Sequence, residues 1–108
     1  MSYDIYLGID TGAADLTTVY EVGNYTSNVS PMWTRALGQP LSELHGMTAA
    51  DAVPLLDAGI AALEADPAGF RELNPANGWG RYEGALKYLE ELRAGCAEHP
   101  KTVVRVSH

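Results

Sequence analysis

The stretch Asp4-Ile5-Tyr6-Leu7-Gly8-Ile9, close to the start of the chain, decides the fold. Every second side chain in it is apolar, namely Ile5, Leu7 and Ile9, and this two-residue period is typical of a β-strand with one buried face. A second alternating segment, residues 16–22, follows a turn-like sequence at residues 10–15. The two segments together predict a β-hairpin with a loop of about six residues.

The end of the chain repeats the alternation, with Thr102, Val104 and Val106 on one face, and predicts a third strand. Three helices are expected between the hairpin and this strand: residues 30–37, a helix that begins at Thr48 or Asp51, and a last helix over about residues 80–98. A short turn from Asp66-Pro67 through Phe70 is expected between the last two helices. A cap at Thr48 would leave Pro54 inside the second helix, whereas a cap at Asp51 would place it in the first turn.

The order β-β-α-α-α-β predicts an α+β fold in two layers, a small antiparallel sheet of about three strands with the helices on one face. The C-terminal strand is expected to pair with the hairpin, and the pattern does not tell which edge it joins. A chain of 108 residues suits one hydrophobic core, so residues 1–108 are expected to form a single domain.

Charge and composition limit the classes of function. The chain has 14 Asp and Glu against 7 Lys and Arg, a net charge of −7, and its basic residues are scattered, so we expect no nucleic-acid partner. No apolar run approaches the roughly 20 residues that span a bilayer, and MSYDIYLGID lacks the basic region of a signal peptide, so no membrane role is expected. Cys96 is the single cysteine and can form no internal disulfide. We therefore expect a cytoplasmic protein.

The first candidate for chemistry is the hairpin turn Gly8-Ile9-Asp10-Thr11-Gly12-Ala13. It resembles the catalytic loop of retroviral-type aspartic proteases, where the Asp shares a proton with its mate and activates water. It also resembles the first phosphate hairpin of sugar kinases and actin-like ATPases. The first family needs a β-rich chain with a flap, and the second needs two large lobes. An ordinary polar turn is the competing interpretation, and a hydrolase based on Asp10 is the alternative function.

Two segments rich in amide, hydroxyl and aromatic side chains are the candidate binding sites. The first is residues 24–33, which lead into a helix N-terminus. The second is residues 74–84, in which two glycines flank a tryptophan. We expect ligand or partner contacts at Asn24, Thr26, Asn28, Trp33, Asn77, Trp79 and Tyr82. The structural alternative makes Asn28 and Ser30 helix caps and packs both tryptophans on the core.

The same segments carry a resemblance. Asn-Tyr-Thr-Ser-Asn-Val-Ser-Pro-Met-Trp at residues 24–33 and Asn-Pro-Ala-Asn-Gly-Trp-Gly-Arg-Tyr-Glu-Gly at residues 74–84, with the acidic helix and Val-rich end that follow, are similar to small uncharacterised proteins of actinobacteria and their phages. The resemblance covers residues 24–106. It implies a bacterial or phage source and a cytoplasmic protein, and it implies no particular activity.

The acidic residues suggest a partner of opposite charge. Residues 36–70 contain no Lys or Arg and five acids, Glu43, Asp51, Asp57, Glu64 and Asp66. Such a run is usually a solvated helix face, but it also suits a basic protein surface, including mimicry of nucleic-acid charge by a phage protein. The three histidines lack the spacing of metal ligands, so no metal or cofactor is expected. The expected function is a small acidic binding module that acts on a host protein, without catalytic residues.

Overall fold

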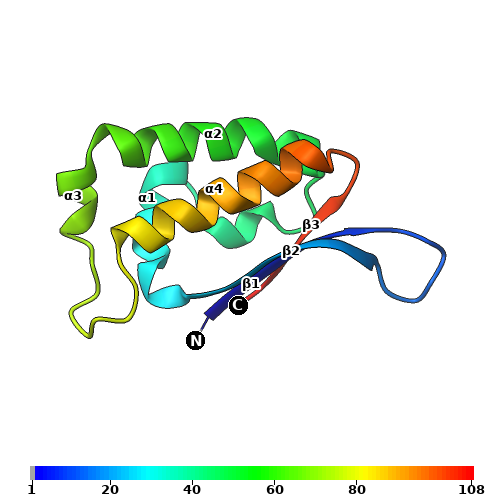
Figure 1. The fold of residues 1–108 in the computed structure, drawn as a ribbon, viewed down its shortest axis with the longest axis horizontal. Helices are drawn as coiled ribbons and strands as arrows, with labels where there is room; N and C mark the ends of the chain where they lie inside the picture. Colours follow the sequence, from blue (N-terminus) through cyan, green and yellow to red (C-terminus); the bar gives the residue numbers. More distant parts are fainter. Residues whose placement is uncertain (1) are drawn as a thin grey trace.

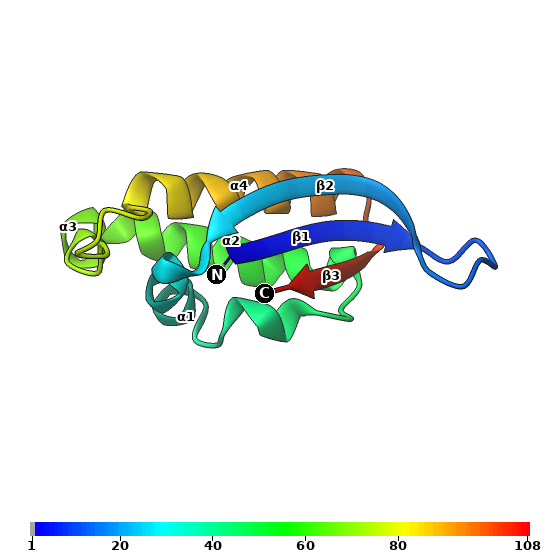
Figure 2. The ribbon, with the colours of Figure 1, turned by 90° about the horizontal axis from the view of Figure 1, so that it is seen from below.

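The computed structural model describes residues 2–108 and contains a three-stranded antiparallel sheet in the order β2-β1-β3. The strands are β1 (Ser2–Ile9), β2 (Thr17–Thr26) and β3 (Val103–Ser107). The helices lie together on one face of this sheet, as Figure 1 and Figure 2 show from two directions. The expected two-layer α+β fold is therefore confirmed.

One helix more than expected lies between β2 and β3. The α-helices are α1 (Ser30–Leu37), α2 (Ala49–Ala65), α3 (Pro67–Arg71) and α4 (Tyr82–Glu98), and two short 3₁₀ turns, η1 (Ser27–Val29) and η2 (Leu41–Leu44), flank α1. The additional helix, α3, has five residues and forms because the Asp66 side chain accepts a hydrogen bond from the Gly69 amide, with Pro67 in the first turn. None of the helices within residues 2–108 is long and apolar enough to cross a membrane.

The most buried of the three strands lies at the centre of the sheet. Tyr3, Ile5 and Leu7 of β1 are buried, so β1 occupies the centre of the sheet. The third strand joins β1 rather than β2, with a register that runs from Asp4 opposite Ser107 to Gly8 opposite Val103. The C-terminal strand therefore joins the hairpin on the side of β1 that faces away from β2, a choice that the sequence left open.

The start of α2 is the first of the two positions that the sequence allowed, whereas the start of α1 differs from expectation. Thr48 caps α2, because its hydroxyl accepts from the Asp51 amide at 3.3 Å, and the helix continues unbroken through Pro54. Ser30, which the structural alternative for residues 24–33 makes a helix cap, does not cap α1. The turn η1 precedes it, and the capping hydroxyl is supplied one turn earlier by Thr26, which accepts from the Asn28 amide.

Trp33 of α1 connects the two layers. Its side chain is 0% exposed, and its indole N–H donates a hydrogen bond to the backbone carbonyl of Ala85 at 3.1 Å. Its ring centroid lies 5.2 Å from that of Tyr3 in the sheet and 5.4 Å from that of Tyr88 in α4. These aromatic contacts fix α1, α4 and β1 relative to one another.

Candidate functional site

The two segments singled out in the sequence do meet in space. The Arg81 amide donates a hydrogen bond to the Tyr25 hydroxyl at 3.2 Å. Gly80 has φ +92°, and a side-chain carbon there would lie 2.5 Å from Thr26 Cγ2 and 2.7 Å from Val29 Cγ1. Only glycine allows both this backbone conformation and this close approach. Residues 25–29 and 80–81 therefore form one packed junction.

The two tryptophans, however, do not share a site. Trp33 is buried inside the core, whereas the Trp79 side chain is 68% exposed. Tyr82 is buried as well, and its hydroxyl donates to the Leu63 carbonyl at 2.7 Å. Trp33 and Tyr82 are thus core residues in this structure. Trp79 alone among the three aromatic candidates presents its ring at the surface.

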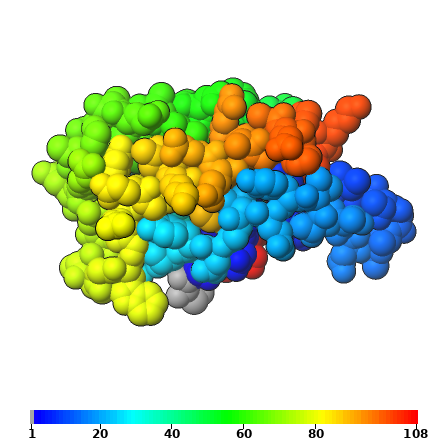
Figure 3. All heavy atoms as spheres, in the orientation of Figure 1, coloured from blue at the N-terminus to red at the C-terminus, as the bar shows by residue number. Residues whose placement is uncertain are grey.

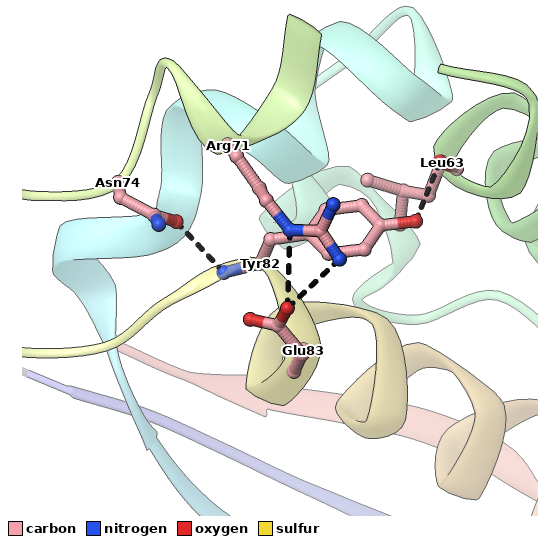
Figure 4. A network of polar contacts seen from close by, with 5 residues as sticks. All are labelled: Leu63, Arg71, Asn74, Tyr82 and Glu83. Carbon is pink, nitrogen blue, oxygen red and sulfur yellow. Dashed lines mark hydrogen bonds and ion pairs between the residues drawn. The ribbon is translucent and has the colours of Figure 1, made fainter. Parts of the chain in front are cut away.

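The loop that carries Trp79, residues 72–81, is fixed at its base (Figure 4). The Asn74 side-chain oxygen accepts from the Tyr82 amide at 2.8 Å. The Arg71 guanidinium lies 4.9 Å from the centre of the Tyr82 ring and binds the Glu83 carboxylate at 3.0 Å. The backbone amide of Glu83 itself, in the first turn of α4, and the Arg71 side chain both hold the pKa of the Glu83 carboxyl below its ordinary value.

The tip of this loop is ordered by short-range hydrogen bonds. The Asn77 side-chain oxygen accepts from the Trp79 amide at 2.9 Å, and the Gly78 amide donates to the Pro75 carbonyl at 3.2 Å. Gly78 and Gly80 both have positive φ, at 75° and 92°. Asn77 is therefore a positioning residue that shapes the turn, and Trp79 is the residue that the turn displays.

The polar residues of the first segment bond mainly to each other. The Thr26 hydroxyl accepts from both the backbone and the side-chain amide of Asn28, at 3.3 and 3.1 Å. The Asn24 side-chain amide donates to the Asp4 carboxylate on the neighbouring strand at 3.3 Å. Asn24 and Asn28 remain exposed, and Thr26 is half-buried.

A shallow groove of about 210 Å³ runs between β2 and α4. Asn24 and Tyr25 line it from the strand, and Lys87, Tyr88 and Glu91 line it from the helix. β2 and α4 lie side by side on the face that Figure 3 shows. Asn24 is the one predicted contact residue in this groove.

Two glycines of α4 allow β2 to approach so closely. A methyl group on Gly84 would overlap the Tyr25 hydroxyl, and one on Gly95 would lie 2.5 Å from Tyr20 Cε1. The Tyr20 hydroxyl in turn donates to the Glu91 carbonyl at 3.2 Å. Sequence reasoning missed this pairing of tyrosines with helix glycines. The available signal was the presence of glycine inside an otherwise regular helix, which usually has a packing reason.

The acidic run at residues 36–70 is partly neutralised within the chain. Arg93 binds Asp57 at 2.8 Å, and Arg35 binds Asp66 at 3.8 Å. Outside this run, Glu83 pairs with Arg71, and the Lys87 ammonium lies 3.9 Å from the Glu91 carboxylate. Of the five predicted contact acids, Glu43, Asp51 and Glu64 form no ion pair within the described residues 2–108.

The hairpin turn has the geometry of an ordinary polar turn. The Asp10 carboxylate accepts from the Gly12 amide at 2.8 Å, and Gly12 has φ 87°. The hydroxyls of Thr11 and Thr17 lie 2.9 Å apart. Asp10 is exposed, and no three His, Cys, Asp or Glu side chains within residues 2–108 are placed to hold a metal.

Comparison of the chain with protein-family models, with curated proteins and with solved structures finds no match.

Proposed function

We propose that this chain is a small acidic protein-binding module that acts by recognition, and that Trp79 is the centre of its contact with a partner protein. The observation that supports this proposal is the 68% exposure of the Trp79 side chain. The other tryptophan, Trp33, is buried with its indole N–H bonded, as a tryptophan is when it only stabilises a fold.

The loop makes Trp79 suited to binding because it is already ordered. Asn77 fixes the turn at the tip, and the contacts of Arg71, Asn74 and Tyr82 fix the base. A loop whose backbone is already ordered loses little conformational entropy when a partner covers it. Tryptophan is also among the residues most enriched at the centre of protein interfaces.

The proposed partner is a protein of the host cytoplasm. The resemblance of residues 24–33 and 74–84 to small proteins of actinobacteria and phages supports a host protein as the target. The buried, single Cys96 is compatible with a reducing compartment. The hydrolase alternative gains no support, because Asp10 bonds to the local backbone.

Capture from an actinobacterial lysate tests the proposal. The wild-type chain, Trp79→Ala and Ile9→Ala are immobilised separately, and the captured proteins are identified by mass spectrometry and titrated directly. Ile9 is the matched control because it is an exposed apolar residue, 38% accessible, beside the hairpin loop. We expect Trp79→Ala to lower the affinity for the captured partner by about 30-fold or more, as loss of an interface hot spot does. Ile9→Ala should bind like the wild type.

The melting temperature separates binding from folding in this experiment. Because the Trp79 ring is largely in solvent, its removal should leave the melting temperature within about 2 °C of wild type. A partner that binds Trp79→Ala as tightly as the wild type would refute the proposal.

A further inference from the structure

One edge of the sheet is closed by the chain itself. Next to β3, the Gly46 amide donates to the Val104 carbonyl and the Val104 amide donates to the Met47 carbonyl, both at 2.8 Å. The Val106 amide donates to Nδ1 of His45 at 2.9 Å. The amide and carbonyl of Val104 and the amide of Val106, on the outer side of β3, therefore already have partners. Such cover is a common protection of edge strands against pairing with another chain.

The opposite edge, that of β2, is open. β2 has ten residues and, among residues 2–108, pairs with β1 alone. Apart from that pairing, one hydrogen bond within residues 2–108 reaches its backbone, from the Tyr88 hydroxyl to the Gly23 carbonyl at 2.8 Å. The strand contains no Lys and no Pro, which are residues that commonly blunt an edge.

The part of this edge that keeps a regular register with β1 is short and lies next to the groove between β2 and α4. Register shifts opposite Ile5/Tyr6 and Leu7/Gly8 interrupt β2 in its first part and leave residues 23–26 in uninterrupted register with β1. This stretch borders the groove against α4, and Gly80 of the Trp79 loop packs on Thr26 at its end. Apart from the Gly23 carbonyl, which the Tyr88 hydroxyl already occupies, an added strand would find outward backbone groups of β2 without a partner within residues 2–108, next to a groove for a side chain.

The charge of this region indicates the chemistry of the occupant. The first 34 residues hold four acids, Asp4, Asp10, Asp15 and Glu21, and no Lys or Arg. Glu21 is exposed on β2 itself, Asp4 is exposed on the neighbouring β1 opposite Asn24, and Lys87, which lines the groove, already faces Glu91. A second copy of the chain would bring two Glu21 carboxylates and two net charges of −7 together, whereas an extended basic segment would be attracted.

We propose that residues 23–26 of β2 accept an extended, Lys- or Arg-bearing segment of the partner protein as a fourth strand of the sheet. Backbone hydrogen bonds supply affinity, and the groove between β2 and α4 receives an alternate side chain of the added strand. This inference rests on the proposed binding function and names the class of partner and the surface that it uses.

Synthetic peptides test the proposal directly. The probe is an eight-residue peptide of alternating Lys and Val with blocked ends, compared with a Glu-Val peptide and with a Lys-Val peptide methylated at every backbone nitrogen. We expect only the unmethylated Lys-Val peptide to bind the wild-type chain, with binding that weakens as salt rises. Amide hydrogen exchange, read by NMR, should slow at residues 23–26 and stay unchanged at β3, whose edge is closed.

A pair of charge reversals locates the site. Glu21→Lys should weaken Lys-Val binding roughly three- to tenfold, because it replaces an attractive charge beside the edge by a repulsive one. Glu90→Lys is the matched control, since it makes the same change in net charge at an exposed residue of α4 that does not line the groove. Equal loss in both variants would indicate attraction by net charge alone and would overturn the proposal.

Other outcomes also decide the matter. Slowed exchange at residues 23–26 that grows with protein concentration and needs no peptide would assign the edge to a second copy of the chain. Binding of the methylated or the Glu-Val peptide with equal affinity would exclude strand addition by a basic segment. If the peptides fail while Trp79→Ala still abolishes capture of the natural partner, the inference is wrong and the proposed function stands. If the peptide adds to β2 and Trp79→Ala has no effect on capture, the proposed role of Trp79 is wrong and strand addition to β2 stands.

Discussion

Replacement of Gly84 by Ala tests the packing that shapes the groove between β2 and α4. In an exposed helix interior this change stabilises a protein by about 1 kcal/mol, because alanine has the higher helix propensity. Here the new methyl group would overlap the Tyr25 hydroxyl and lie 2.5 Å from Tyr25 Cζ. The tyrosine ring must therefore move away from α4 for the variant to fold.

The cost of that movement can be worked out from the contacts of Tyr25. Its hydroxyl would lose the hydrogen bond from the Arg81 amide, now 3.2 Å long, at a net cost of about 1 kcal/mol. Its ring would also loosen its packing against Trp33 and Tyr88, whose centroids lie 6.3 and 6.1 Å away, at about 0.5–1.5 kcal/mol for each pair. After the gain in helix propensity, the expected net destabilisation is about 1–3 kcal/mol.

Urea denaturation followed by circular dichroism measures this change in the free energy of unfolding. The decisive comparison repeats Gly84→Ala in a Tyr25→Ala background, where no ring stands in the way and the substitution should now stabilise by about 1 kcal/mol. The sign of the effect is thus expected to reverse between the two backgrounds. Stabilisation by Gly84→Ala in the wild-type background, or equal effects in both, would refute the reasoning.

Three further predictions concern the core, a helix cap and the thiol. Trp33→Ala should lower the free energy of unfolding by about 3–5 kcal/mol and leave the Ala85 carbonyl without its donor; a loss below about 1 kcal/mol in urea denaturation would contradict the burial of Trp33. Thr48→Ala should cost about 1 kcal/mol by removing the acceptor of the Asp51 amide, whereas Thr48→Ser should cost less in the same assay. Burial raises the pKa of the Cys96 thiol from 9.0 to about 11, so a thiol reagent at pH 8 should react only after urea unfolds the chain. Because the folded-state pKa is the higher one, the stabilising effect of Cys96 is complete below pH 9 and is lost as the pH rises toward 11, which melting curves over that range should show.

The candidate site was only partly predictable. Residues 24–33 and 74–84 were identified from their unusual polar and aromatic content, and residues 25–29 do contact residues 80–81. Which tryptophan would be exposed was not predictable, because both stand next to turns that can tuck or present an indole. The open edge of β2 was not foreseen either, since it depends on β3 and residues 45–48 covering the opposite side.

The sequence by itself determined the class of each element in the larger part of the chain. Alternation at Ile5 and Leu7 indicated a strand, and spacings of three and four around Leu89 and Leu92 indicated a helix, because side-chain period is a local property of the backbone. Gly38 ends α1 in the left-handed conformation for an equally local reason, since only glycine enters it without steric cost.

Only the tertiary structure decided which of these residues face solvent and which edges remain open. Whether Trp33 is buried depends on Tyr3 and Tyr88, which are far from it in sequence and reach it through the packing of the helices on the sheet. Whether β2 is open depends on β3 pairing with the other side of β1. Which of the two tryptophans is exposed and which strand edge stays open are therefore set by contacts between distant segments and not by a local pattern.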